Sequence, residues 1–282
     1  MFSSETKKTL QFTFIICFVS AFILSTLSIV LQGPQQTAKL LDQSQQMLFA
    51  AQILNHKGSF QIQDSNGEFI PAYFDGTKLI PSDHAIKASD ADTLNVYHLL
   101  IHPMLTNEAG ELFTFEQAGI NYDEYMKLHQ KSGFADLPYK LLYIVGDKQG
   151  YVIPINGFGL WDAIYGYLAL DADADTVLGA TWYAQAETAG LGANIALPEW
   201  QAQFHGKLIF QQSISGSTDF ARAPLGITVV KGKVADSLGT TPKSLSAVDG
   251  ISGATLTGNG VTTAYAECLG PYRPFLIKAA RK

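Results

Sequence analysis

The most distinctive hydrophobic pattern in the chain is a run of apolar residues near its N-terminus. The 20 residues from Phe12 to Leu31 carry no charge and are interrupted only by hydroxyl side chains. A helix of this length rises about 30 Å, which matches the hydrocarbon core of a bilayer. The exit from the run, Ile29 to Gln32, offers no small-x-small cleavage site. The pattern therefore predicts an uncleaved transmembrane helix over residues 12–31 rather than a signal peptide.

The charges that flank this run indicate its direction. Lys7 and Lys8 precede it, whereas Lys39 is the nearest cation after it and is soon followed by Asp42. Positive charge favours the cytoplasmic side of a membrane. We therefore expect residues 1–11 to be cytoplasmic and the remainder of the chain to be extracytoplasmic.

Two segments of different pattern follow the apolar run. Beyond Gly33 and Pro34, residues 35–56 place apolar side chains at helical spacing without a further Pro or Gly, which predicts an amphipathic helix. Residues 57–140 mix short apolar runs with turn signals. We expect this second segment to be an extracytoplasmic region, and its sequence indicates no chemistry.

From residue 141 onward the pattern changes to short β-rich runs separated by glycines and acidic turns. Two pairs of runs predict hairpins, two further runs predict strands, and two segments predict helices. The hairpins join 141–145 to 151–155 and 164–170 to 176–183, the further strands are 207–212 and 227–234, and the helices are 197–204 and 259–269. The combination favours an α+β domain over 141–277 with a largely antiparallel sheet and flanking helices.

Two candidate metal motifs are incomplete. His98 and His102 are four residues apart, which would place them on one helix face, but no third ligand accompanies them and Pro103 follows. The acidic run that starts at Asp171 begins like a calcium loop but has Thr176 in place of glycine and Trp182 in place of glutamate. We expect packed or surface histidines and a solvated hairpin turn, with no metal site.

Composition narrows the class of protein. Hydrophobic residues make up 47% of the 282 residues and charged residues only 16%. After residue 40 there are 16 Lys and Arg against 24 Asp and Glu, so the body is acidic and would repel nucleic acid. The two cysteines, Cys17 and Cys268, are too few for an iron–sulfur or Cys-rich zinc site. Any redox cofactor would have to be held by another group.

The segment with the most unusual composition is DGISGATLTGNG, residues 249–260. It is no P-loop, because Asn259 stands where the phosphate-binding lysine should follow Gly258. A nucleophile elbow at Ser252 lacks its last glycine, and no histidine follows His205. Two interpretations stay open on the residues alone: a loop that binds a phosphate-tethered ligand at a helix start, or an ordinary Gly/Ser/Thr-rich loop.

The first seven residues of this segment, DGISGAT, resemble the flavinylation motif of the FMN-binding domain family. In that family the last hydroxyl of the motif is joined to FMN through a phosphoester. The resemblance implies that Thr255 is the attachment residue and that Ser252, Gly253 and Ala254 are the small residues around the phosphate. It also implies that Asp249 and Thr257 are cofactor-binding residues.

A second stretch, ETAGLG at 187–192, resembles the family's ETPGLG loop and departs from it at Ala189, where proline is usual. Without proline at this position, the dihedral angle φ is less restricted. It leaves in place five residues that the resemblance implies as cofactor-binding, namely Glu187, Thr188, Gly190, Leu191 and Gly192.

Three further segments resemble the NqrC family, which belongs to the Na+-translocating NADH:quinone oxidoreductases. They are NGFGLWDAIYGYLAL from Asn156, a W-x3-F-x-G-K pattern that ends at Lys207, and GPYRPFL from Gly270. The resemblance implies that Trp161 and Leu191 enclose the flavin ring and that Lys207 favours an anionic reduced flavin. A lysine exposed at a strand end is an alternative interpretation of Lys207, and core packing is an alternative for Trp161.

The implied protein is an electron-transfer subunit with FMN covalently attached to Thr255. It would lie in a membrane complex of six subunits in the bacterial inner membrane, with one span and a periplasmic main domain, and a flavin transferase would load it. The complex would pass electrons from NADH toward ubiquinone and export Na+. Two alternatives remain: the FMN subunit of an Rnf complex, which shares the motif, and a non-redox, membrane-tethered assembly or binding module.

Overall fold

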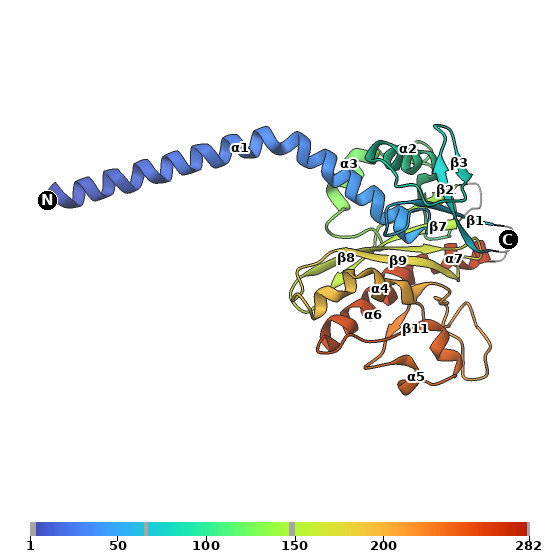
Figure 1. Cartoon of the computed structure of the whole chain (residues 1–282). Coiled ribbons are helices and arrows are strands. Elements are labelled where there is room, and N and C mark those ends of the chain that lie inside the picture. Colours follow the sequence, from blue (N-terminus) through green and yellow to red (C-terminus); the bar gives the residue numbers. More distant parts are fainter. Residues whose placement is uncertain (1–3, 65–66, 147–149, 281–282) are drawn as a thin grey trace. The chain divides into compact units, whose positions relative to one another are not determined.

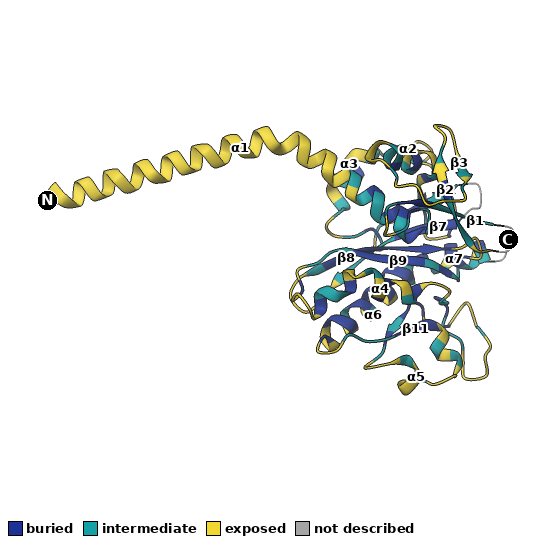
Figure 2. Cartoon of the chain, in the orientation of Figure 1, coloured by how far each residue is buried: buried dark blue, intermediate teal, exposed yellow. Residues whose placement is uncertain are grey.

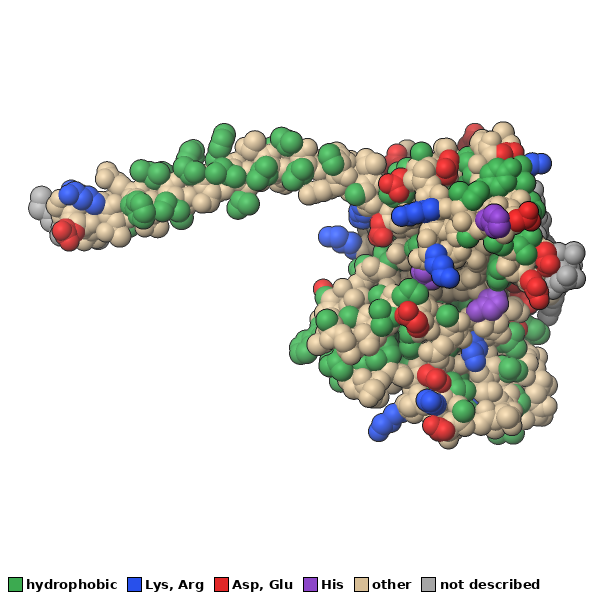
Figure 3. Space-filling model, in the orientation of Figure 1, with side chains coloured by type: hydrophobic (Ala, Val, Ile, Leu, Met, Phe, Trp, Pro, Cys, Tyr) green, Lys and Arg blue, Asp and Glu red, His purple; other side chains and the backbone are tan. Residues whose placement is uncertain are grey.

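The structure of the protein is a computed structural model that describes residues 4–64, 67–146 and 150–280. The chain divides into two compact units, Met1–Gln43 and Ser44–Lys282. The first unit consists of helix α1, which spans Ser4–Ala50 and so extends into the second unit. All its side chains from residue 4 to residue 40 are exposed (Figure 2), and apolar side chains are spread along it (Figure 3). Among the described residues, α1 is the helix long and apolar enough to cross a membrane.

The second predicted helix, 35–56, differs from the structure at both ends. The helix does not restart after Gly33, because α1 continues through Pro34 without interruption. It ends at Ala50 because Gln52 adopts a left-handed conformation with φ of 57°. The amide of Gln52 then donates to the carbonyl of Phe49, and that of Ile53 donates to the carbonyl of Leu48. This pair of bonds is the Schellman arrangement that closes a helix C-terminus.

A six-stranded antiparallel sheet organises the second unit. Its strand order is β5-β4-β6-β7-β8-β9. The strands are β4 Ile101–Thr106, β5 Leu112–Phe113, β6 Lys140–Val145, β7 Gly150–Phe158, β8 Ala163–Leu170 and β9 Val177–Ala184. Both predicted hairpins are confirmed, and the first one's turn, 147–149, lies outside the described residues. The Asp171 amide donates to the Thr176 carbonyl, which closes the acidic turn as a hairpin.

The sheet also includes part of the segment that precedes residue 141. Strand β4 pairs with β6 from Ile101 opposite Val145 to Thr106 opposite Lys140. The predicted boundary at 141 therefore falls inside the sheet, because β4 and β5 come from the 57–140 segment. This pairing also separates the two histidines: His98 lies in the last turn of helix α2, Asp90–Leu100, whereas His102 lies in β4. The described residues contain no cluster of three or more metal-ligating side chains.

Helices cover both faces of the sheet (Figure 1). One face packs against α4, α6 and α7, with Trp182, Tyr265 and Leu168 in its core. The other face packs against helices α2 and α3 and against the C-terminal end of α1, with Leu48 and Tyr143 in its core. The helices and remaining strands are α3 Tyr122–His129, α4 Pro198–Gln201, α5 Val234–Ser237, α6 Thr255–Leu269, α7 Arg273–Ala280, a small sheet of β1 Phe60–Gln63, β2 Phe69–Phe74 and β3 Leu79–Pro81, and the parallel pair β10 Thr228–Val229 and β11 Ala247–Val248.

The predicted strand over 207–212 is wrong, and the one over 227–234 shrinks to the two residues of β10. Residues 207–212 form only isolated bridges because their hydrogen bonds alternate between two partners. Ile209 donates to the carbonyl of Asp175 on one side, and Gln211 donates to the carbonyl of Pro224 on the other. The predicted helices are confirmed: α4 with the 3-10 turn Ala202–Phe204 covers 198–204 of the predicted 197–204, and α6 begins four residues earlier than predicted.

Glycine substitutions test whether the 57–140 segment is an integral part of the sheet domain. Gly110 and Gly119 have positive φ of 73° and 65°. Only a Cβ at Gly110 would overlap other backbone atoms, those of Pro274 and Phe275 in α7. We expect Gly110→Ala to lower the free energy of unfolding by about 3 kcal/mol and Gly119→Ala by about 1 kcal/mol. Urea unfolding of the two variants measures the difference. Equal losses would show that α7 does not pack on this turn.

Candidate functional site

The carboxylate of Glu187 joins three separate segments of the chain. Its Oε1 accepts hydrogen bonds from the amides of Leu160 and Trp161, each at 2.9 Å. Its Oε2 accepts the hydroxyl hydrogen of Thr257 at 2.5 Å. We call Glu187, Leu160, Trp161 and Thr257 the Glu187 cluster. It ties the β7–β8 turn and the 187–192 loop to helix α6.

Two glycines allow the chain to approach this carboxylate closely. A Cβ at Gly159 would overlap Oε1 of Glu187, and a Cβ at Gly192 would lie 2.7 Å from Oε2 and 2.5 Å from the Thr257 hydroxyl. Real Cβ atoms do not approach other atoms this closely, so any larger residue would open the cluster. The predicted importance of Gly192 thus has a steric cause that involves Glu187 and Thr257.

Hydrogen bonds keep Glu187 ionised despite its burial. The side chain is only 8% exposed. Burial by itself raises the pKa of Glu187, but the Thr257 hydroxyl and the amides of Trp161 and Leu160 outweigh it and hold the pKa below its usual value. The cluster therefore contains a negative charge at neutral pH.

Beside this cluster lies a group of exposed apolar side chains, which we call the apolar rim. Trp161 is 68% exposed and Leu191 41%, and the indole nitrogen of Trp161 donates to the Thr188 hydroxyl at 3.1 Å. Phe158, at the end of β7, and Leu256, in the first turn of α6, are 75% and 60% exposed, and we count them with the rim because both elements lead to the Glu187 cluster. A group of large exposed apolar side chains is typical of a binding surface.

The 187–192 loop presents Leu191 through a tight turn. The amides of Leu191 and Ala193 both donate to the Thr188 carbonyl, and Gly190 takes the positive φ of 75° that the turn requires. Ala189 fits this turn in place of proline. The loop thus keeps its shape through Gly190 and the Thr188 carbonyl.

An open groove of about 640 Å³ begins where helix α6 begins, and we call it the α6 groove. It is lined by residues 229–233, 249–255 and 258–259. The first residue of α6, Thr255, is exposed in it, as are Lys231 and Lys233. The first amides of a helix lack partners within the helix, and the N-cap residue Ala254 has no side-chain oxygen to cap them. The unpaired amides at the N-terminus of α6 and the positive charges of Lys231 and Lys233 together favour the binding of an anion in the groove.

The groove and the apolar rim are adjacent. A Cβ on Gly253, whose φ is 76°, would lie 2.9 Å from a methyl group of Leu191. A ligand with an anionic end and a flat apolar end could therefore occupy both. Ser252, Gly253 and Ala254 line the part of the groove that leads to Thr255.

Three expected site residues have other partners in the structure. The Oδ1 of Asp249 accepts the amide of Val234 at 2.8 Å, so Asp249 stabilises the groove wall. The Thr257 hydroxyl donates to Glu187 and is buried. The Lys207 ammonium donates to the Ser244 carbonyl at 3.0 Å. Burial holds the pKa of Lys207 below its usual value, and the charge of Asp249 offsets only part of this effect. A contact of Lys207 with a flavin stays a prediction.

The sequence pattern did not identify Lys231 and Lys233 or the role of Leu160. The two lysines stand in a short K-G-K run well upstream of the DGISGAT motif, and only the fold brings them into one groove with Thr255. The amide of Leu160 carries no signal in the sequence at all, because any residue except proline supplies one.

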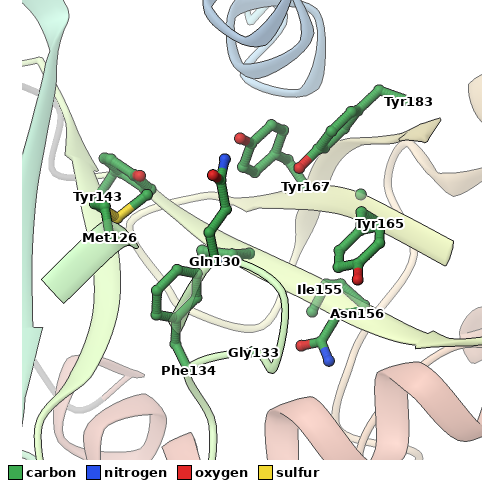
Figure 4. A pocket seen from close by; sticks show the side chains of 12 residues that line it. Met126, Gln130, Gly133, Phe134, Tyr143, Ile155, Asn156, Tyr165, Tyr167 and Tyr183 are labelled. Carbon is green, nitrogen blue, oxygen red and sulfur yellow. The ribbon is translucent and has the colours of Figure 1, made fainter. Parts of the chain in front are cut away.

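A second cavity, on the other face of the sheet, is too small for a cofactor (Figure 4). Its volume of about 20 Å³ suits a single water molecule. Around it, Tyr167 stacks on Tyr183 with ring centres 4.9 Å apart, and burial raises the pKa of Tyr143 and Tyr167 well above the usual value. These phenols therefore stay protonated and belong to the core.

The α6 groove can take an anionic group and the apolar rim a flat apolar ring, which are the two parts of a flavin mononucleotide. In agreement, residues 159–270 match the family model of the FMN-binding domain. That range contains the Glu187 cluster and the whole α6 groove. The class of protein is thus a flavin-binding one with an α+β fold.

Relatives along the whole chain specify the family. The chain is 42% identical to the NqrC subunit of the Na(+)-translocating NADH-quinone reductase of Chlamydia caviae, over 99% of this chain and 94% of the relative. It is 30% identical to the NqrC subunit of Vibrio parahaemolyticus over 96% and 94%. A crystal structure of the NqrC subunit from Parabacteroides distasonis superposes with a TM-score of 0.56 at 25% identity, covering 87% of this chain and 96% of the other. The chain belongs to the NqrC family of Na(+)-translocating NADH-quinone reductases.

The lowered pKa of Glu187 predicts a specific pH dependence of stability. A carboxylate whose folded pKa is depressed stabilises the fold fully above its unfolded pKa, and the contribution disappears as the pH falls through the folded pKa. We expect wild type to be more stable than Glu187→Gln at pH 7, with the difference shrinking below about pH 4.5. Thermal unfolding of both proteins between pH 7 and pH 3 measures this. A difference that is constant over that range would contradict an ionised Glu187.

Proposed function

We propose that this chain carries electrons through an FMN that is esterified to Thr255 through its phosphate. The observation that carries the proposal is the exposed Thr255 hydroxyl at the start of α6, in a groove that also contains Lys231 and Lys233. A phosphoester there would place its negative charge between the helix N-terminus and the two lysines. The match to the FMN-binding domain supports the identity of the ligand.

The structure supports Thr255 over its neighbour Thr257 as the attachment residue. The Thr257 hydroxyl is buried and donates to Glu187 at 2.5 Å. Ser252 is exposed in the same groove. The choice between Ser252 and Thr255 rests on the DGISGAT motif, in which the last hydroxyl is the acceptor.

Each part of the site has a separate task in holding the cofactor. We propose that Trp161 and Leu191 lie on the two faces of the ring and exclude water from them. The Thr188 hydroxyl and the backbone of 190–192 are placed to reach the polar edge of the ring. Gly253 and Ala254 leave room for the phosphate, and Lys231 and Lys233 balance its charge. Bound FMN supplies the redox chemistry, and these residues position it and tune its surroundings.

The relatives support a place in a larger assembly. They are named as subunits of a Na(+)-translocating NADH-quinone reductase. We propose that this chain works within such a complex of six subunits, which passes electrons from NADH toward ubiquinone and exports Na+. A flavin transferase would attach the FMN. The names of the relatives favour this assembly over an Rnf complex and over a non-redox module.

The apolar part of α1 supports a single membrane span. We propose that the span crosses the bacterial inner membrane over 12–31, with Lys7 and Lys8 in the cytoplasm and the FMN-binding part in the periplasm. A covalent bond keeps the cofactor from being lost where free FMN is scarce.

Two threonine variants test the attachment. In cells that load the wild-type protein, we expect Thr255→Val to abolish flavin fluorescence of the protein band in a denaturing gel, because the acceptor oxygen is gone. Thr257→Val is the matched control: it removes a hydroxyl two residues away and leaves the acceptor, so its band should stay fluorescent at half the wild-type intensity or more. Fluorescence in Thr255→Val would refute the ester at Thr255.

Protease accessibility tests the orientation. Protease added to spheroplasts should digest residues 44–282, because the proposed orientation exposes them outside the inner membrane. Inverted vesicles should protect the same residues. Immunoblotting of a C-terminal tag reports both results, and the reverse pattern would contradict the orientation.

A further inference from the structure

We infer that Glu187 is a positioning residue, which sets the relative placement of Trp161, Leu191 and the Thr255 helix through its carboxylate. This inference rests on the proposed function for the identity of the ligand. It changes the expected role of Glu187, and of its partner Thr257, from contacting the cofactor to holding the walls that contact it.

The β7–β8 turn depends on hydrogen bonds for its shape because its side chains are not packed inside. Leu160 is 47% exposed and Trp161 68%. Their amides point inward and donate to the same oxygen of Glu187. A side chain that points outward from such a turn takes its direction from the backbone. The carboxylate holds the backbone from which the indole of Trp161 projects, and the hydrogen bond from the indole nitrogen to the Thr188 hydroxyl completes its placement.

The opposite wall and the attachment helix are held by the same group. Leu191 lies four residues after Glu187 in one tight loop, in which the Thr188 carbonyl accepts two amides. The Thr257 hydroxyl that donates to Glu187 lies two residues after Thr255 on α6. One carboxylate thus links both walls of the proposed ring site to the helix that carries the proposed ester.

Charge makes these bonds stronger than neutral ones. A buried carboxylate that accepts three donors gains shorter and stronger hydrogen bonds than an amide or hydroxyl would. Burial also keeps water from replacing the donors, since the side chain is 8% exposed. Glutamine has the same shape and can accept both amides and donate to Thr257, so it should preserve the geometry while removing the charge.

Hydrogen exchange in the full-length, flavin-free chain tests the inference without any redox assay. We expect Glu187→Ala to speed amide exchange of residues 160 and 161 by about tenfold or more, because both amides lose their acceptor. Glu187→Gln should stay within about threefold of wild type. Glu267→Ala removes an exposed glutamate on α6 and should change nothing. Equal exchange in Glu187→Ala and Glu267→Ala would overturn the inference.

The flavin-loaded chain provides the second readout. We expect Glu187→Ala to keep the ester, seen by mass spectrometry, but to lose about half or more of the visible circular dichroism of the flavin and of its quenching of tryptophan fluorescence. Glu187→Gln should restore both signals. Unchanged signals in Glu187→Ala would show that the carboxylate does not position the walls.

Two further variants separate the possible failures. If Glu187→Ala does not fold, Thr257→Val provides the test, because it removes only the link to α6. It should lower the flavin dichroism, and Thr257→Ser should restore it. Wild-type dichroism in Thr257→Val would overturn the inference.

Thr255→Val should leave exchange at residues 160 and 161 as in wild type. Retention of the flavin ester in that variant, with normal exchange, would therefore count against the proposed function alone and leave the inference on Glu187 intact.

Discussion

A carboxylate that leaves water loses hydration worth several kcal/mol unless hydrogen-bond donors replace it. Glu187 meets this constraint with two backbone amides and one hydroxyl, taken from the β7–β8 turn and from α6. The need to satisfy one buried charge thus fixes three segments that are distant in sequence. Gly159 and Gly192 follow from the same constraint, because larger residues would keep the donors away. The segments that form the proposed cofactor site are therefore held in place by the Glu187 carboxylate.

The six-stranded sheet supports the proposed site. Part of the sheet and the helices on its second face come from residues outside the range that matches the FMN-binding domain. Strands β7 and β8 end at the turn that carries Trp161, and α6 packs on the face of the sheet where Trp182 and Tyr265 are buried. The opposite face would be exposed if α2, α3 and the end of α1 did not cover it. Residues 57–140 thus complete the sheet and its second layer, which answers a question that their sequence pattern leaves open.

Local patterns predicted what local forces determine. The hairpins of β6–β9 followed from alternating residues and turn signals, and α6 followed from a helical period. The pairing of β4 with β6 was missed because it joins segments some forty residues apart and leaves no mark on either. The end of α1 was misplaced because the left-handed residue there is Gln52, where glycine would have signalled the stop. In the site, the motifs predict a role for Thr255 and for the 187–192 loop, and these stay predictions. Residue types alone do not show that Thr257 donates to Glu187 or that Lys231 lines the same groove as Thr255.

We propose that one carboxylate arranges a site in which FMN joins Thr255 and lies between Trp161 and Leu191. An experimental structure of the full-length chain purified with its flavin would test this arrangement. We expect continuous density from the Thr255 hydroxyl oxygen through a phosphate to a ring between those two side chains, with Glu187 accepting hydrogen bonds from the amides of Leu160 and Trp161. Density that joins Ser252 or Thr257, or a ring that contacts the Glu187 carboxylate directly, would contradict it.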